Sequence, residues 1–152
     1  MSSRSIFRLF TFYTAFVTLC WAQHSGIVVD HAMVNELPPG ITVTAGYLEI
    51  ENRTGAVLTL ESVNSPDFGQ VEIHQSVIRE GIATMSRQDS LDIPAGTRLR
   101  FAPGGYHLML FNPTRELHTG DNVTLVFNFA SQSPVSISAP VVRPGHMHEQ
   151  HH

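Results

Sequence analysis

Turn-forming residues recur along most of the chain, and their spacing limits the possible folds more than any other feature of the sequence. The clusters PPG, NRTG, SPDFG, PAG and PGG separate short segments that are apolar or alternate between apolar and polar residues. Turn signals about ten residues apart are typical of an all-β sandwich or barrel. No segment keeps a long apolar period of about 3.6 residues, so we do not expect a helix-rich fold.

The segments between these turns predict the strands. We expect strands at residues 26–34, 41–52, 56–65, 70–78, 82–88, 90–93, 97–102, 105–112, 122–130 and 134–142. In segment 41–52, Ile41, Val43, Ala45 and Tyr47 share one face. The alternation blurs from Leu48 onward, which predicts that both faces of this strand are partly buried.

Residues 1–22 have the pattern of a secretory signal peptide. Arg4 and Arg8 precede an apolar run that is shorter than the ~20 residues of a membrane-spanning helix. We expect cleavage after Ala22; lipidation of Cys20 or an uncleaved anchor is the alternative, and the bulky Leu19 disfavours lipidation. Cleavage removes the only cysteine of the chain. The exported domain then has no disulfide, no catalytic thiol and no thiolate for a blue-copper centre.

The rest of the composition bounds the domain organisation and the partners. The formal net charge is −4 and no basic block occurs, so we do not expect nucleic-acid binding. We expect residues 23–142 to form one domain. The segment RPGHMHEQHH, residues 143–152, has no core pattern and is predicted to be a flexible tail.

Histidine and methionine supply most of the candidate chemistry. The two-residue period of a strand puts Glu72 and His74 on one face, and likewise His107 and Met109; Met85 lies in a semi-polar segment. Taken singly, such a methionine is usually a core filler, and such a histidine usually lies at the surface or makes a hydrogen bond. Together, two imidazoles and two thioethers are a soft, neutral donor set that suits Cu(I). Mg²⁺ and Ca²⁺ prefer oxygen, and zinc sites seldom use methionine.

The spacing of these residues resembles a known pattern. His74, ten intervening residues, Met85, twenty-one intervening residues and then His107-Leu108-Met109 are similar to the H-x10-M-x21-H-x-M motif of the periplasmic copper chaperones called PCu(A)C. The resemblance covers roughly residues 40 to 130. It implies a cupredoxin-like Greek-key β-sandwich or barrel, in which His74, Met85, His107 and Met109 bind one Cu(I).

The resemblance also implies a function. Members of the PCu(A)C family are periplasmic chaperones that supply copper to respiratory sites, in particular the Cu(A) centre of cytochrome c oxidase. The expected partner is therefore the oxidase subunit that carries Cu(A), or another copper chaperone, and the expected state is a monomer without enzymatic activity. A periplasmic copper storage or resistance protein with the same ligands is the alternative. A copper oxidase or reductase would need an open coordination position and acid–base residues, and the sequence offers no such cluster.

The carboxyl-terminal tail holds a second cluster of metal-binding residue types: His146, Met147, His148, His151 and His152. Short histidine-rich tracts bind metal ions, and imidazoles without an enforced geometry suit Cu(II). A second Cu(II) site is one hypothesis for this tail, and a solvated tail or part of a tag is the other. We expect His31 and His118 to be structural or surface residues.

Overall fold

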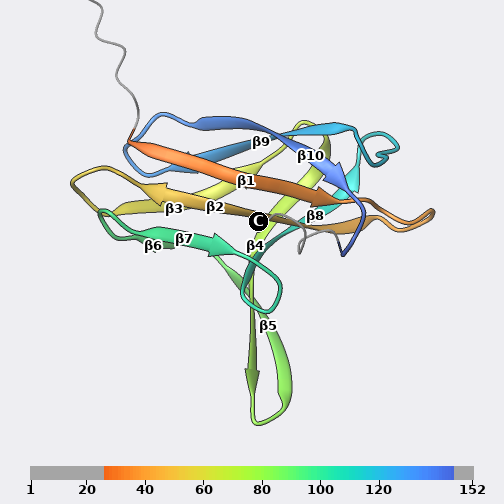
Figure 1. The fold of residues 1–152 in the computed structure, drawn as a ribbon, viewed down its shortest axis with the longest axis horizontal. Helices are drawn as coiled ribbons and strands as arrows, with labels where there is room; N and C mark the ends of the chain where they lie inside the picture. Colours follow the sequence, from red (N-terminus) through yellow and green to blue (C-terminus); the bar gives the residue numbers. More distant parts are fainter. Residues whose placement is uncertain (1–25, 146–152) are drawn as a thin grey trace, which may run out of the picture.

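The described part of the chain consists of β-strands joined by turns (Figure 1). The computed structural model describes residues 26–145, so the predicted signal peptide and residues 146–152 lie outside it. Its strands are β1 Ile27–Asn35, β2 Val43–Asn52, β3 Leu58–Asn64, β4 Phe68–Arg79, β5 Ile82–Gln88, β6 Leu91–Ile93, β7 Arg98–Phe101, β8 Tyr106–Pro113, β9 Asn122–Phe129 and β10 Val135–Val142. Within residues 26–145 there is no helix that could cross a membrane. The predicted all-β fold class is confirmed.

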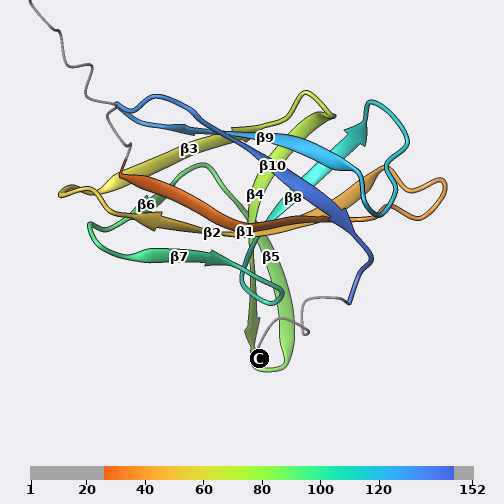
Figure 2. The same ribbon diagram turned by 45° about the horizontal axis from the view of Figure 1, so that its top comes forward.

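The strands form one open hydrogen-bonded sheet in the order β5-β4-β8-β7-β2-β1-β10-β9-β3-β6, with a further pairing between β8 and β2. Strand β1 joins the two halves of this order. It pairs antiparallel with β2 and parallel with β10, where Val34 lies opposite Val141. The sheet folds over at this junction, and Figure 2 shows β3 and β9 in a layer above β2 and β7.

The hydrophobic core lies between the two halves of the folded sheet. Leu108 and Leu110 of β8 and Ile50 of β2 come from one half, and Leu125 and Phe127 of β9 come from the other; all five are fully buried in one cluster. Burial of one such side chain stabilises the fold by about 1.5–3 kcal/mol. The chain has a single cysteine and forms no internal disulfide, so this core carries the stability of the domain.

Burial alternates along strand β2 without a break, and the first two residues of its core face are polar or small. Thr44 and Gly46 are buried, whereas positions 43, 45 and 47 are half-buried on the outer face. The Thr44 hydroxyl donates to the Asn35 carbonyl at 2.8 Å, so its burial leaves no unpaired hydroxyl. A Cβ at Gly46 would lie 3.1 Å from Leu110 Cδ1, so this close approach favours glycine. Both faces are partly covered, as expected.

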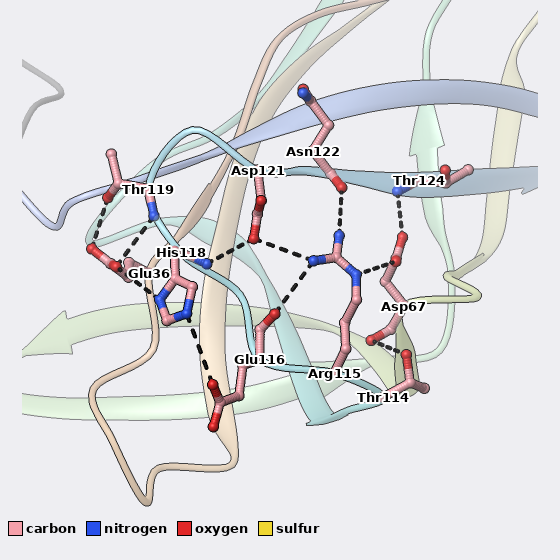
Figure 3. Close-up of polar contacts among 10 residues, drawn as sticks. All are labelled: Glu36, Asp67, Thr114, Arg115, Glu116, His118, Thr119, Asp121, Asn122 and Thr124. Carbon is pink, nitrogen blue, oxygen red and sulfur yellow. Dashed lines mark hydrogen bonds and ion pairs between the residues drawn. The ribbon is translucent and has the colours of Figure 1, made fainter.

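A polar network fixes the connection between β8 and β9 (Figure 3). Arg115 lies at its centre, with Nη1 3.2 Å from Asp121 Oδ2 and Nε 3.6 Å from Asp67 Oδ1. Nη2 donates to the Asn122 carbonyl at 3.1 Å. Asp67 also accepts the backbone N–H of Thr124 at 2.8 Å. The network therefore ties the turn before β4 to the start of β9.

Candidate metal centre

The two predicted histidine ligands lie directly opposite each other. His74 of β4 pairs with His107 of β8, and their ring centroids are 6.0 Å apart with the planes tilted by 45°. The neighbours Ile73 and Leu108 are buried in the core, so the two imidazoles project from the outer face of the sheet. Imidazole nitrogens bind metal ions at about 2.0 Å, and the spacing of the two rings leaves room for one ion between them.

The two methionines flank this histidine pair on opposite sides. Met109 is two residues from His107 and lies opposite Glu72. Met85 of β5 lies opposite Ser76, which is two residues from His74. Directly opposite residues of an antiparallel pair share a face, so all four predicted ligands project from the same outer face. Diagonal neighbours across a strand pair are about 7–8 Å apart, which is within the reach of long side chains.

Exposure within this group increases from strand β8 to the edge strand β5. His107 is only 6% exposed, whereas Met85 is 56% exposed. His74 and Met109 are half-buried between these extremes. Strand β5 is the edge of the sheet, and its hairpin with β4 extends away from both layers (Figure 1). The group is therefore closed at His107 and open at Met85.

The turn before β8 holds His107 in place. The N–H of Gly105 donates to the Ala102 carbonyl at 3.0 Å, and Gly104 has a φ of 79°, a conformation that favours glycine. The Gly105 carbonyl accepts the Ser76 N–H at 3.0 Å and lies 3.1 Å from Nδ1 of His107. A carbonyl can only accept, so in the neutral imidazole Nδ1 of His107 carries the proton and Nε2 keeps its lone pair.

A carboxylate lies beside the other histidine. Oε2 of Glu72 is 2.7 Å from Nε2 of His74, and Oε1 accepts hydrogen bonds from Arg87 at 2.9 Å and from Gln70 at 2.7 Å. The hydrogen bond with His74, together with the charge of Arg87, holds the pKa of Glu72 below its usual range. Strand alternation places Glu72 on the face of His74, and this Glu-x-His spacing is the signal from which the contact could have been predicted.

One nitrogen of this pair is left without a partner. Nδ1 of His74 is buried, and no group within residues 26–145 makes a hydrogen bond to it. Such atoms are rare in folded proteins and call for an explanation, such as a bound ion. The same described residues contain no group of three or more His, Cys, Asp or Glu side chains suited to a metal ion. Besides the two histidines, the predicted donors at this position are the two methionines.

The other two histidines within residues 26–145 lie apart from this group. His31 and His118 are both exposed, with Nδ1 of His31 3.8 Å from Glu49 and Nδ1 of His118 3.8 Å from Glu36. These positions agree with the surface role expected for them. The tail residues lie outside the described residues, so the second Cu(II) site stays a prediction; they are His146, Met147, His148, His151 and His152.

Comparisons with known proteins identify the family. The family described as "Putative lipoprotein LpqE-like" matches residues 27–141. The chain belongs to the LpqE-like family. It is 28% identical over 120 residues to a "Putative lipoprotein" of Leifsonia xyli subsp. xyli, covering 78% of this chain and 71% of that protein. It is 26% identical over 102 residues to an uncharacterized protein of Rickettsia prowazekii, covering 66% of this chain and 56% of that protein, so it spans little more than half of that relative.

This LpqE-like chain also resembles solved structures. The copper-bound PCuAC domain from PmoF2 superposes with a TM-score of 0.66 at 25% identity, covering 78% of this chain and 94% of that domain. The solution structure of CuI-DR1885 from Deinococcus radiodurans superposes with a TM-score of 0.63 at 26% identity, covering 77% and 78%. The predicted cupredoxin-like β-fold is confirmed. The predicted resemblance is confirmed as a likeness to PCuAC domains, while the roles of the four motif residues stay predictions.

Proposed function

We propose that this LpqE-like protein is an exported copper chaperone. It binds one Cu(I) between His74, Met85, His107 and Met109 and passes the ion to a respiratory copper protein. The observation that carries the proposal is the strand register, which puts all four soft donors on one outer face. Two of the structures that the chain resembles contain copper according to their names, and one of them contains Cu(I).

The donor set explains the choice of ion and oxidation state. Thioether sulfur is a soft ligand that favours Cu(I), and imidazole accepts copper in either oxidation state. Thioethers carry no proton, so the two methionines bind without a proton being displaced. The site binds and releases the ion, and catalysis is not part of its function.

The exposure of Met85 favours transfer over storage. A storage site gains from enclosing the ion, whereas Met85 is 56% exposed on an edge strand. A partner that approaches from this side can replace the Met85 thioether first, while the buried His107 still holds the copper. The proposed recipient is the subunit of cytochrome c oxidase that carries Cu(A), or another copper chaperone, and the protein acts as a monomer.

The location follows from the amino-terminal segment. We place the protein in the periplasm, exported by residues 1–22; the description of the matching family and the name of the Leifsonia xyli relative both contain the word lipoprotein. Intact-mass analysis of the protein from the periplasm separates the two routes. Cleavage after Ala22 leaves a chain that begins at Gln23, whereas lipidation leaves a chain that begins at a modified Cys20.

The tail is proposed as a separate Cu(II) site. Titration with Cu(II) of the full chain and of a chain that ends at Gly145 measures its contribution. We expect the full chain to bind at least one Cu(II) more than the shortened chain. Equal Cu(II) stoichiometry of the two chains would contradict a metal site at residues 146–152.

The main proposal is tested by Cu(I) titration under reducing, oxygen-free conditions against a chromogenic Cu(I) chelator. In chains that end at Gly145, we expect one Cu(I) per protein and a sharp loss of affinity in the double variant His107→Ala, Met109→Ala. The matched control is His118→Ala, which removes an exposed imidazole 3.8 Å from Glu36 and should leave the affinity unchanged. Full affinity in the double variant would show that the site is wrongly assigned.

A further inference from the structure

We propose that Glu72 is a positioning residue that selects Nδ1 of His74 as the copper-binding nitrogen, while His107 binds through Nε2. The inference rests on the proposed function and extends it from four side chains to the individual donor atoms. It is carried by two observations on β4: the hydrogen bond of Glu72 with Nε2 of His74, and the buried, unpartnered Nδ1 of the same ring.

The tautomer of His74 follows from what its neighbours can accept. A carboxylate without a proton can only accept hydrogen bonds, so Nε2 of His74, 2.7 Å from Glu72 Oε2, must carry the ring proton in the neutral imidazole. The lone pair then lies on Nδ1. The side chain of His74 is 16% exposed and its Nδ1 is buried, so a metal ion would supply the partner that Nδ1 lacks.

The carboxylate can orient His74 because it is itself held. Glu72 uses one oxygen for His74 and the other for Arg87 and Gln70, at 2.9 and 2.7 Å. These contacts come from β5 and from β4, and they leave Glu72 little freedom to turn towards the metal. A hard carboxylate oxygen is a poor partner for Cu(I), so holding Glu72 on the far nitrogen also keeps it out of the coordination sphere.

The same reasoning applied to His107 selects its other ring nitrogen, Nε2. Its Nδ1 faces the Gly105 carbonyl at 3.1 Å, which leaves the lone pair on Nε2. The two imidazoles of the site therefore offer different nitrogens, one oriented by a carboxylate and the other by a backbone carbonyl. Outer partners of this kind fix the tautomer of metal-binding histidines and raise their basicity, and their loss costs about 10–100-fold in metal affinity.

The first test needs no copper. Long-range ¹H–¹⁵N NMR spectra of the metal-free protein distinguish a protonated ring nitrogen from an unprotonated one. At neutral pH we expect His74 as the Nε2–H tautomer in the wild type, a mixture of tautomers in Glu72→Ala, and an unchanged His74 in Glu49→Gln. Glu49 is a matched control, because it is a carboxylate bonded to Arg98 at 2.9 Å and 3.8 Å from the imidazole of His31.

The second test adds Cu(I). The same spectra identify the coordinated nitrogen of each ring, and we expect Nδ1 for His74 and Nε2 for His107. Competition with a Cu(I) chelator should show that Glu72→Ala binds about 10–100-fold more weakly than the wild type. Glu72→Gln keeps an oxygen that can accept from Nε2, so it should retain the His74 tautomer and lose less affinity. Glu49→Gln should bind like the wild type.

The outcomes separate this inference from the proposed function. A wild-type protein that binds no Cu(I) would overturn the proposed function. A wild type that binds Cu(I) through Nε2 of His74, or a folded Glu72→Ala variant with unchanged Cu(I) affinity, would overturn the role of Glu72 and leave the chaperone proposal standing. A metal-free protein with the proton on Nδ1 of His74 would overturn the inference whether or not copper binds.

Discussion

At the scale of single residues, the outer face of the sheet is organised by carboxylates that hold cationic side chains. Glu72 lies between His74 and Arg87, and Glu51 lies between Arg53 and Arg98 at 2.9 Å from each. Such exposed pairs contribute little to stability individually. Their effect is to fix the ionisation and direction of a side chain. At Glu51, the hydrogen bond from Arg53 and the contact with Arg98 lower the pKa to about 2.

The low pKa of Glu51 predicts how stability depends on pH. In the unfolded chain the Glu51 carboxylate takes up a proton near pH 4.5, whereas in the folded chain it stays ionised until about pH 2. The contribution of Glu51 is therefore complete above pH 4.5 and is lost as the pH falls through this window. Urea unfolding at pH 7 and pH 2.5 should show a smaller loss of stability for Glu51→Gln than for the wild type.

Glu61→Gln is the control for this measurement, because Glu61 is exposed on β3 and has no ion pair within the described part of the chain. It should lose as much stability as the wild type between the two pH values. If Glu51→Gln showed the same pH dependence as the wild type, the interaction of Glu51 with the two arginines would not survive in solution.

At the scale of elements, the β4–β5 hairpin differs from the rest of the sheet. Among the described strands, β5 pairs only with β4, and its residues from Ile82 to Arg87 are exposed. Nearby Ile78 and Ile82 are 71% and 66% exposed. Strand β8, in contrast, lies inside the sheet and carries the fully buried Leu108 and Leu110. Few buried contacts allow β5 to open at a low cost in free energy, whereas β8 opens only when the whole domain unfolds.

Hydrogen exchange should show this difference and its dependence on copper. We expect the amides of β5 to exchange much faster than those of β8 in the metal-free protein. If Met85 is a ligand, Cu(I) ties β5 to the two histidines, so exchange in β5 should slow down in the wild type. The Met85→Ala variant should still bind Cu(I), with a lower affinity than the wild type. Its hydrogen exchange in β5 should be the same with and without Cu(I). Equal slowing in both proteins would remove Met85 from the ligand set.

At the scale of the whole molecule, one core holds the two halves of the sheet together. The face that carries the predicted ligands and the core face belong to the same strands, β4 and β8, whose residues alternate between the two. Packing of Leu108 and Leu110 against β9 residues such as Phe127 therefore sets the positions of His107 and Met109. The site is held by the core although none of its predicted ligands belongs to the hydrophobic cluster.

A substitution in the core tests this dependence. Phe127→Ala removes a fully buried ring, and we expect it to lower the free energy of unfolding by about 3–5 kcal/mol. Ile41→Ala is the control, because Ile41 is 51% exposed and its loss should cost less than about 0.5 kcal/mol. Chemical denaturation followed by circular dichroism measures both. A cost for Phe127→Ala as small as that for Ile41→Ala would contradict a core shared by both halves.

Much of the architecture could be predicted from local sequence patterns. The turn clusters mark the ends of the strands, since glycine and proline interrupt regular structure wherever they gather. Alternation shows that His107 and Met109 leave β8 on the same side and that Leu108 and Leu110 leave it on the other. The core face of β2 was harder to predict, because the burial of Thr44 and Gly46 depends on contacts with Asn35 of β1 and Leu110 of β8, which are on neighbouring strands.

The sequence by itself determined the strands, the face that each side chain takes on its own strand, and the residue types available to a metal ion. Only the tertiary structure decided that His74 lies opposite His107, that Met85 stands on an exposed edge, and that Glu72 occupies one nitrogen of His74. The reason is physical. Alternation depends on the backbone of one strand, whereas pairing and register depend on the packing of the whole sheet, and a shift of one residue would move every side chain to the other face.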